Sequence, residues 1–301
     1  MKWEKIKQIY IPEGEYSHGA NPVAVWLTDS VYRIYFNVRD NNSKSYITYL
    51  DYDIQKHEIV FRALNPVVFP GELGCFDDSG CSLGSIVRIS EEMEYIYYLG
   101  WNLSVTVPWR NSIGLVIHNL KEDTYTKYSR APILDRSEVD PFSISYPFVM
   151  KRENCFQMWY GSCLDWGGVG RGRWFAIKYG VSSDGISWEP TGKVCISGPP
   201  PSGSVLIGCS RPSVILDNNI YRMWYSYRGE KYRIGYAESQ DGLDWVRKDD
   251  EVGIGISDHG FDSEEIGYPM VFAHDGKLFM LFCGNGYGKT GFGIAELVED
   301  E

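Results

Sequence analysis

The chain has 301 residues, 44% of them hydrophobic, and carries a formal net charge of -11 at pH 7. A strongly acidic chain is repelled by nucleic acid and by anionic membrane surfaces, so neither is expected as a partner. No apolar run is long enough to span a bilayer, and the charged start of the chain does not form a signal peptide. We therefore expect a soluble, cytoplasmic protein whose partner is neutral or is held by a local cationic pocket.

Aromatic residues make up 15% of the chain, including 22 Tyr and 10 Trp. This content suits packing between twisted sheets and a stacking platform for a sugar or a base. The 7 cysteines have no CxxC spacing, and none of the 5 histidines pairs with a cysteine at ligand spacing. Buried free thiols are therefore expected, and the sequence indicates neither a metal site nor another cofactor.

The predicted strands follow one another in groups of three. A strand at residues 3–11 precedes the first group and belongs to none of them. Short turns rich in Asp, Asn and Gly separate several of the strands within a group. The groups lie at residues 21–26, 32–36 and 46–50; 83–87, 94–99 and 112–117; 146–150, 156–160 and 175–179; 211–216, 221–226 and 232–237; and 268–272, 278–282 and 291–295.

One motif, Ser-x-Asp-Gly-x-x-Trp, occurs at residues 182–188 and again at 239–245. In both copies Asp-Gly supplies a tight turn into a fourth strand, which starts at Trp188 or at Trp245. Internal repetition at a period of about sixty residues indicates a repeat architecture, and four-stranded repeats are typical of a β-propeller.

The groups together predict an all-β fold, a five-bladed β-propeller of four-stranded antiparallel blades, in one domain covering residues 1–301. The last group stops after three strands, so residues 3–11 are predicted to supply its fourth strand and to close the ring. The predicted blades cover residues 18–72, 76–137, 139–198, 206–257, and 261–298 plus 3–11. The sequence does not indicate an oligomeric state.

A large polar residue precedes the proline at the start of most inner strands. In a propeller these strands face the central channel, at the end where ligands enter. Proline begins strands well because its φ is fixed and it has one donor fewer, but this does not account for the residue before it. The second blade has Leu83 and no proline at this position. We predict that the others bind substrate: Asn21, Tyr146, Arg211 and Tyr268.

Two acidic loops, at residues 76–78 and 261–265, lead into the inner strands of the second and fifth blades. Two carboxyl groups that face one cavity are what glycosidic cleavage requires, one as acid and one as base or nucleophile. We predict Asp78 and Glu265 as catalytic residues. Asp77 and Glu264 are the alternatives, because successive residues of an extended loop point opposite ways. The competing interpretation is that these acids are solvated or stabilise turns.

The ends of the second strands and nearby loops carry further groups that clamp hydroxyls or anions and stack on sugars. We predict substrate-binding roles for His18, Arg39, Asp40, Trp101, Asp165 and Arg228. The loops at 101–110 and 164–174 are longer than hairpins need, and their Trp, Gly and Arg content favours a lid or a subsite wall. No helix is predicted after residues 167–173, so a phosphate-cradling loop is not favoured there.

The chain resembles the five-bladed β-propeller glycosidases: the arabinanase and β-xylosidase group, the invertase and levansucrase group, and the mannoside phosphorylases. The resemblance covers all five predicted blades. It rests on the two Ser-x-Asp-Gly-x-x-Trp motifs, on Tyr-Arg-Met-Trp-Tyr at 221–225 and on Ser-Arg-Pro at 210–212. It implies sugar chemistry in the channel, with an Asp before the first-blade proline as base or nucleophile, a second Asp as modulator and a later Glu as acid. Arg211 matches a substrate-binding position of that pattern.

The chain departs from the pattern at the first-blade position, which is Asn21, because an amide acts neither as a base nor as a carboxylate nucleophile. Tyr146 stands where the third blade would carry an acidic partner. We interpret the protein as a glycoside hydrolase-like enzyme with relocated carboxylates, acting on a glycan or glycoside. A non-catalytic propeller that binds a carbohydrate or sugar nucleotide is the alternative. A protein-interaction propeller is less favoured, because the polar residues converge on channel positions.

Overall fold

The computed structural model describes residues 1–167, 173–198 and 208–299. Residues 168–172 of the predicted lid loop and the start of the predicted fourth blade at 206 lie outside these ranges. The described elements are strands, apart from a 3-10 turn at Asp249–Glu251 and the short α1 at Asn285–Gly288. The predicted all-β class is thus confirmed. No helix in the described ranges combines the length and apolar content needed to cross a membrane.

The chain divides into two compact units. Unit 1 comprises Met1–Val67, Ser213–Tyr227 and Lys231–Glu301, and unit 2 comprises Val68–Pro212 and Arg228–Glu230. The strands that lie wholly or mostly in unit 1 are β1 (Lys2–Tyr10), β2 (Ser17–Thr28), β3 (Val31–Arg39), β4 (Ser45–Asp53), β5 (Glu58–Arg62), β15 (Ile220–Arg228), β16 (Tyr232–Ser239), β17 (Trp245–Arg247), β18 (Gly267–His274), β19 (Lys277–Cys283) and β20 (Phe292–Glu299). The strand β14 (Gly208–Asp217) is divided, with its first half in unit 2 and its second half in unit 1. Those of unit 2 are β6 (Gly80–Ser90), β7 (Met93–Leu103), β8 (Trp109–Asn119), β9 (Thr124–Lys127), β10 (Ile144–Lys151), β11 (Phe156–Asp165), β12 (Trp174–Ser182) and β13 (Glu189–Ser197).

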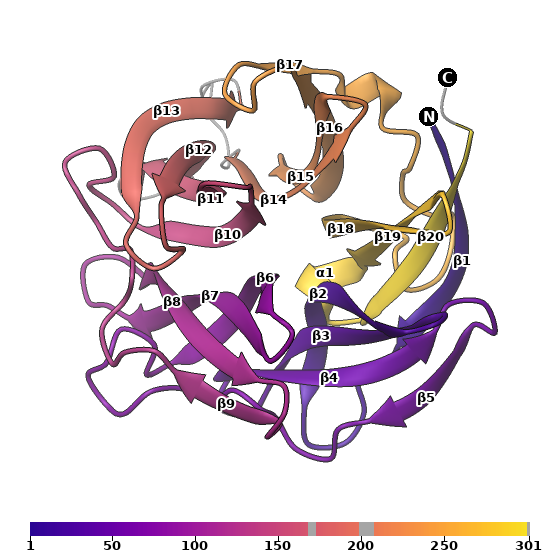
Figure 1. Cartoon of the computed structure of the whole chain (residues 1–301), viewed down its shortest axis with the longest axis horizontal. Coiled ribbons are helices and arrows are strands. Elements are labelled where there is room, and N and C mark those ends of the chain that lie inside the picture. Colours follow the sequence, from indigo (N-terminus) through magenta and orange to yellow (C-terminus); the bar gives the residue numbers. More distant parts are fainter. Residues whose placement is uncertain (168–172, 199–207, 300–301) are drawn as a thin grey trace. The chain divides into compact units, whose positions relative to one another are not determined.

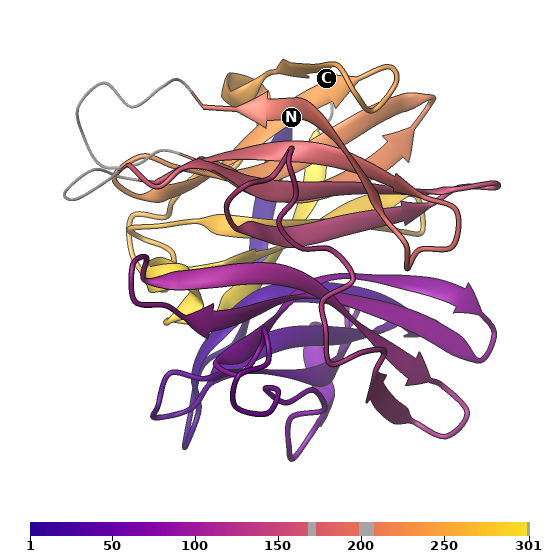
Figure 2. The same ribbon diagram turned by 90° about the vertical axis from the view of Figure 1, so that its left-hand side faces the viewer.

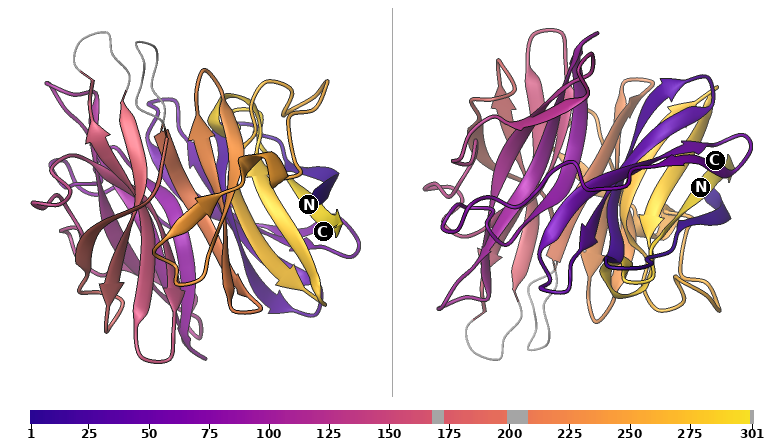
Figure 3. Two further views of the ribbon diagram at one scale, coloured as in Figure 1. Left: turned by 90° about the horizontal axis from the view of Figure 1, so that it is seen from above. Right: turned by 90° about the horizontal axis from the view of Figure 1, so that it is seen from below.

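In unit 1 the N-terminal strand pairs with the last strand of the chain. β1 runs antiparallel to β20, from Lys2 opposite Glu299 to Tyr10 opposite Phe292, and the order of this sheet is β1-β20-β19-β18 (Figure 1). The strands β18 to β20 and β1 can be followed in yellow and indigo in both panels of Figure 3. The predicted partner of the N-terminal strand is therefore confirmed, whereas the number of blades and the closure of a ring stay predictions.

The meanders expected from the sequence are present in both units. In unit 1, β2, β3, β4 and β5 pair antiparallel in chain order. In unit 2, β6 to β9 do the same (purple to magenta in Figure 2), as do β10 to β13. The four-stranded groups are not fully separate sheets, because within unit 2 Phe175 of β12 forms a parallel pair with Gly208 in the first half of β14.

The repeated motif folds into the same turn in each copy. In unit 2, Ser182 Oγ accepts from the Gly185 N–H, and Asp184 Oδ1 accepts from the amides of Ile186 and Ser187. These backbone bonds lower the pKa of Asp184 to about 2. The Trp188 indole then donates to the Gly185 carbonyl. The second copy, at residues 239–245 in unit 1, repeats these contacts, so the predicted Asp-Gly turns are confirmed.

Each unit has its own apolar core. In unit 1 the first cluster includes Ile34, Leu50 and Phe292, and a second joins β1 to β15 through Trp3 and Trp224, whose rings meet edge to face at 5.9 Å. In unit 2 the core is formed by a cluster that includes Ile113, Ile144, Met158 and Tyr160.

A buried ion pair joins strand and loop inside unit 2. Lys178 Nζ lies 3.0 Å from Asp140 Oδ1, and the same carboxylate accepts from the hydroxyls of Tyr160 and Ser162. Both charged side chains are almost fully buried. Removal of the lysine would leave the Asp140 carboxylate buried in the core without a cation to neutralise it.

We therefore expect Lys178→Met to lower the free energy of unfolding by about 3–5 kcal/mol, because an uncompensated buried charge is costly. The matched control is Lys2→Met, which breaks the exposed pair with Glu299 and should cost at most about 1 kcal/mol. Urea denaturation of the two variants measures the difference. Equal losses would show that Asp140 does not depend on Lys178.

Candidate functional site

The residues before the inner-strand prolines share an unusual backbone. Asn21, Tyr146, Arg211 and Tyr268 have φ values of 53°, 44°, 55° and 57°, a left-handed conformation that residues other than glycine rarely adopt. In β2, β10 and β18 the strand ladder is also interrupted at this point. Strained residues beside bulges cluster at functional sites. The recurrence marks these four positions as site candidates on structural grounds as well.

In unit 1 two of these positions meet a tyrosine that follows β19. Asn21 Nδ2, fully buried, lies 3.2 Å from Asn37 Oδ1 and 3.2 Å from the Tyr287 hydroxyl. The rings of Tyr268 and Tyr287 meet edge to face at 4.6 Å, and the Arg39 guanidinium lies 5.5 Å from the Tyr287 ring. β2, β3, β18 and α1 thus bring one polar and aromatic cluster together.

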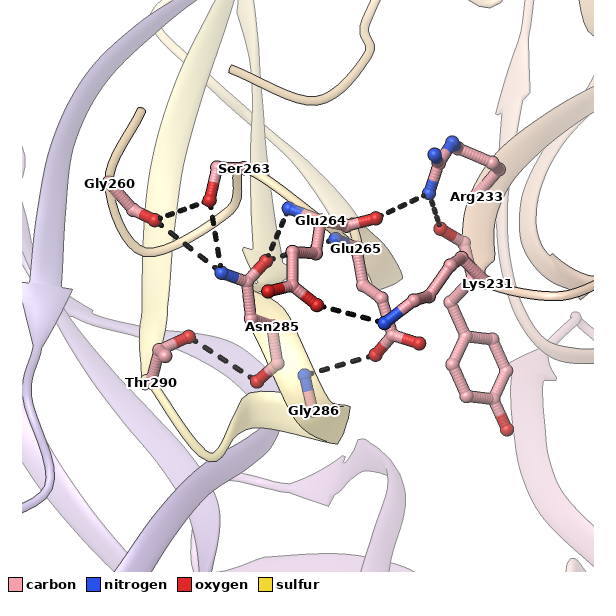
Figure 4. A network of polar contacts seen from close by, with 10 residues as sticks. Lys231, Arg233, Gly260, Ser263, Glu264, Glu265, Asn285, Gly286 and Thr290 are labelled. Atoms are coloured by element: carbon pink, nitrogen blue, oxygen red, sulfur yellow. Dashed lines mark hydrogen bonds and ion pairs between the residues drawn. The ribbon is translucent and has the colours of Figure 1, made fainter. Parts of the chain in front are cut away.

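The loop before β18 directs its two glutamates differently (Figure 4). Asn285 Oδ1 accepts from the backbone amides of both Glu264 and Glu265. The exposed Glu264 carboxylate pairs with Lys231 at 2.8 Å, a contact that lowers the pKa of Glu264. Glu265 is only 7% exposed, and its Oε2 accepts from the Gly286 amide at 3.0 Å. Of the two, Glu265 is the buried one, next to the turn that carries Tyr287.

The Glu265 carboxylate differs from the other buried carboxylates of the acidic loops. Asp262, in the same loop, lies 2.5 Å from Lys5 Nζ. Asp77, in unit 2, is 2% exposed and accepts from Lys127 Nζ at 2.6 Å and from the Tyr98 hydroxyl at 2.8 Å. Within the described ranges no cation forms an ion pair with Glu265, and a single backbone amide is its donor. A buried carboxylate held in this way is a candidate for proton transfer.

Asp78 and the two strained residues of unit 2 lie as follows. Asp78 is half-buried and accepts from the Gly74 amide and the Ser79 hydroxyl, as in a turn. Arg211 is buried and donates from Nη1 to the Gly84 carbonyl at 2.5 Å. A Cβ on Gly84 would lie 2.6 Å from the Pro147 carbonyl oxygen, so this strand packs directly beside Tyr146 and its proline.

The remaining predicted residues lie at strand ends and in turns. Asp40 accepts from the amides of Asn42 and Lys44 and from the Tyr46 hydroxyl. Asp165 is exposed and accepts from the Gly167 amide. Trp101 and Arg228 are half-buried at the ends of β7 and β15. In the two long loops, the Arg173 guanidinium stacks 4.0 Å from the Trp109 ring, which meets Trp166 edge to face.

His18 adjoins the unit 1 cluster. Its φ is 66°, and its Nδ1 lies 2.9 Å from the Ser17 hydroxyl. Burial first, then Arg39 and Lys289, lower the pKa of His18 from 6.5 to about 4. The imidazole is therefore neutral at pH 7.

We expect this shift to appear in the pH dependence of stability. Between pH 6.5 and about 4 the unfolded chain takes up a proton at His18 that the folded chain resists, so stability falls as the pH falls through this window. His18→Asn, which tolerates the left-handed backbone, should flatten the profile there relative to the wild type. The measurement is urea denaturation at several pH values, and parallel profiles would contradict it.

Sequence reasoning found Asn21, Arg39, Tyr268 and Glu265 but missed Tyr287. Its hydroxyl meets Asn21 from 266 residues away in the chain. The available signal was the Gly-Asn-Gly segment at 284–286, which allows the positive φ of Gly286 and the sharp turn that presents Tyr287.

Comparison with solved structures defines the class of fold. A structure named glycoside hydrolase superposes with a TM-score of 0.75 at 15% identity, covering 97% of this chain and 90% of that chain. A thermostable family-43 glycoside hydrolase gives 0.70 at 15% identity, covering 97% and 94%. A structure reported under the GH130 family of mannoside phosphorylases, which contains hydrolases that target β-1,2 mannosidic linkages, gives 0.70 at 14% identity, covering 98% and 93%. The chain therefore has the fold of the β-propeller glycoside hydrolases.

Sequence comparison defines the family more narrowly. The chain is 42% identical over 302 aligned residues to the uncharacterized proteins MT1551 and Rv1502 from two strains of Mycobacterium tuberculosis, covering 99% of each chain. It belongs to the same family as these proteins. No protein-family model matches the chain.

Proposed function

We propose that the protein is a cytoplasmic glycosidase that binds a glycan or glycoside at the unit 1 cluster and cleaves it with Glu265 as the proton donor. The observation that carries the proposal is the Glu265 carboxylate, which is buried and forms no ion pair with a cation of the described ranges. It accepts a 3.0 Å hydrogen bond from the amide of Gly286, the residue before Tyr287. A neighbouring sugar would meet the aromatic rings of Tyr268 and Tyr287 and the amide of Asn21.

Cleavage of a glycosidic bond needs a proton for the leaving oxygen and a second group that stabilises or attacks the sugar carbon. Glu265 suits the first role, because its carboxyl group is buried and no cation in the described part of the chain forms an ion pair with it. Asp78, in the acidic loop of unit 2, keeps its predicted role as the other carboxylate; it is half-buried and accepts from the Gly74 amide and the Ser79 hydroxyl. Asp77 and Glu264 remain the fallback candidates.

Substrate binding is proposed to use the residues that the sequence selected. In unit 1 these are Asn21, Arg39, Tyr268 and His18, with Tyr287 added. In unit 2, Tyr146 and Arg211 carry the same strained backbone, which supports their predicted binding roles. Trp101, Asp165, Arg228 and Asp40 keep their proposed substrate-binding roles, each at a strand end or in the turn that follows it.

A non-catalytic carbohydrate-binding protein is the second candidate, favoured by one observation. Asn21 is fully buried and hydrogen-bonded to Asn37 and Tyr287, so the position where the resemblance implies a catalytic Asp carries no acid. A panel of aryl glycosides and oligosaccharides separates the two candidates, with affinity measured by calorimetry and cleavage by product release. Binding without cleavage of any member would support the binding protein and reject the enzyme.

A further inference from the structure

A cluster of basic groups lies beside Asn21 and Tyr287, although the chain as a whole carries 40 acidic and 29 basic residues. Its members come from three elements: His18 from β2, Arg39 from the end of β3, and Lys289 directly after α1. A cationic group of this kind inside an acidic protein creates a local field that attracts negative ligands.

The backbone fixes these three residues close together. Ser17 is the ladder partner of Arg39, and its hydroxyl contacts His18 Nδ1 at 2.9 Å. The turn of α1 packs directly on β2, because a Cβ on Gly288 would lie 2.4 Å from the Gly19 carbonyl oxygen. Lys289 follows Gly288 in the chain and His18 precedes Gly19, so the contact between the two glycines brings Lys289 and His18 near each other.

The electrostatic effects on His18 agree with this geometry. Arg39 and Lys289 both disfavour its protonation, and no carboxylate in the described ranges acts in the opposite direction. Asp40, the acid next to Arg39 in the chain, already accepts from two backbone amides and from Tyr46. Lys289 is exposed, and no carboxylate within the described ranges pairs with it. His18 Nε2 likewise has no protein partner there.

We infer that the ligand of this site is a sugar bearing an anionic group, a phosphate or a carboxylate, which is bound by His18, Arg39 and Lys289. An arginine offers a fork of donors to such an anion, a lysine a point charge, and the imidazole a further donor. Arg39 also lies over the Tyr287 ring, so the anion would sit at the edge of the proposed sugar position. The inference rests on the proposed function in taking the ligand to be a sugar.

The test is calorimetry with the full-length protein at pH 7 and low salt. The probes are the 6-phosphates of glucose, mannose and galactose, the corresponding uronic acids, the uncharged parent sugars, and inorganic phosphate. We expect at least one charged sugar to bind about tenfold more tightly than its parent, the effect of roughly one additional charge-assisted contact. Lys289→Gln should remove most of that difference.

The matched control is Lys277→Gln, an exposed lysine of the same unit that pairs with Glu296 at the opposite end of β19. It should bind the charged sugar as tightly as the wild type. A second readout is specific to His18. A bound anion would offset the positive charges of Arg39 and Lys289 and so raise the affinity of the His18 imidazole for a proton. Binding near pH 6 should therefore take up protons, which titrations in two buffers of different ionisation enthalpy detect, and His18→Asn should abolish this uptake.

Equal binding of charged and parent sugars, or equal losses in Lys289→Gln and Lys277→Gln, would overturn the inference. Inorganic phosphate that binds as tightly as the sugar phosphates would also overturn it, because the site would then hold a free anion. Failure of the proposed function is distinguishable. Tight binding of a charged sugar without cleavage of any glycoside would reject the enzyme and support the anion site. Cleavage of neutral glycosides without a preference for charged sugars would support the enzyme and reject the anion site.

Discussion

Glu265→Gln is expected to lower turnover of any glycoside that the protein cleaves by about a hundred- to ten-thousandfold, the usual contribution of a general acid or base. The amide has the shape of the carboxylic acid but no proton of suitable acidity to transfer. Its oxygen can still accept from the Gly286 amide, so the turn that carries Tyr287 should keep its place. Binding affinity should therefore change little while the rate collapses.

Glu264→Gln is the matched control, because it makes the same chemical change one residue away on the same loop. Its side chain is exposed and paired with Lys231, so the variant should lose an exposed ion pair and keep its turnover. Initial rates with the best substrate of the glycoside panel give the comparison, and calorimetry with a non-cleaved ligand shows that the site is intact.

The same substitutions discriminate among the proposed carboxylates. Equal rates for Glu265→Gln and the wild type would reject Glu265 as the acid. A loss in Asp78→Asn of similar size would support a two-carboxylate mechanism, whereas a loss confined to Asp77→Asn or Glu264→Gln would move the role to a fallback residue. Cleavage that survives all four amides would reject carboxylate catalysis from these loops.

Much of the fold could be predicted because its signals are local. The Ser-x-Asp-Gly-x-x-Trp turns depend on bonds spanning two or three residues, and those bonds are present in both copies. The strands followed from short apolar runs between turn residues. The pairing of β1 with β20 could be predicted because one group lacked a strand and one strand lacked a group.

The site was predictable only in part, because several of its contacts are non-local. Alignment of the strand groups on their shared proline identified Asn21 and Tyr268. Their left-handed backbone could not be inferred from the sequence. Which of Glu264 and Glu265 turns inward depends on Asn285, about twenty residues away. A cation partner of Asp77 is Lys127, 50 residues further along, so nothing near the Asp-Asp pair indicated that one carboxylate forms an ion pair.

Deletion of residues 1–11 is expected to prevent stable folding of the protein. The deletion leaves β20 as an unpaired edge and removes the buried side chains of Trp3 and Ile9, each worth about 1.5–3 kcal/mol of burial. It also removes Lys5, the ion-pair partner of the buried Asp262, at a further cost of about 3–5 kcal/mol. Together these losses approach the typical total stability of about 5–15 kcal/mol.

Single variants make this expectation testable even where the truncated chain aggregates. Trp3→Ala keeps the β1–β20 ladder but empties the space beside Trp224, and should cost about 3–5 kcal/mol. Lys2→Met, on the same strand, breaks only an exposed pair and serves as the control. Urea denaturation gives the free energies of unfolding, and thermal melting tests the truncated chain. An unchanged melting temperature after the deletion would show that β1 adds nothing to the sheet, and a small loss in Trp3→Ala would place the stabilisation in the ladder and not in the packing beneath it.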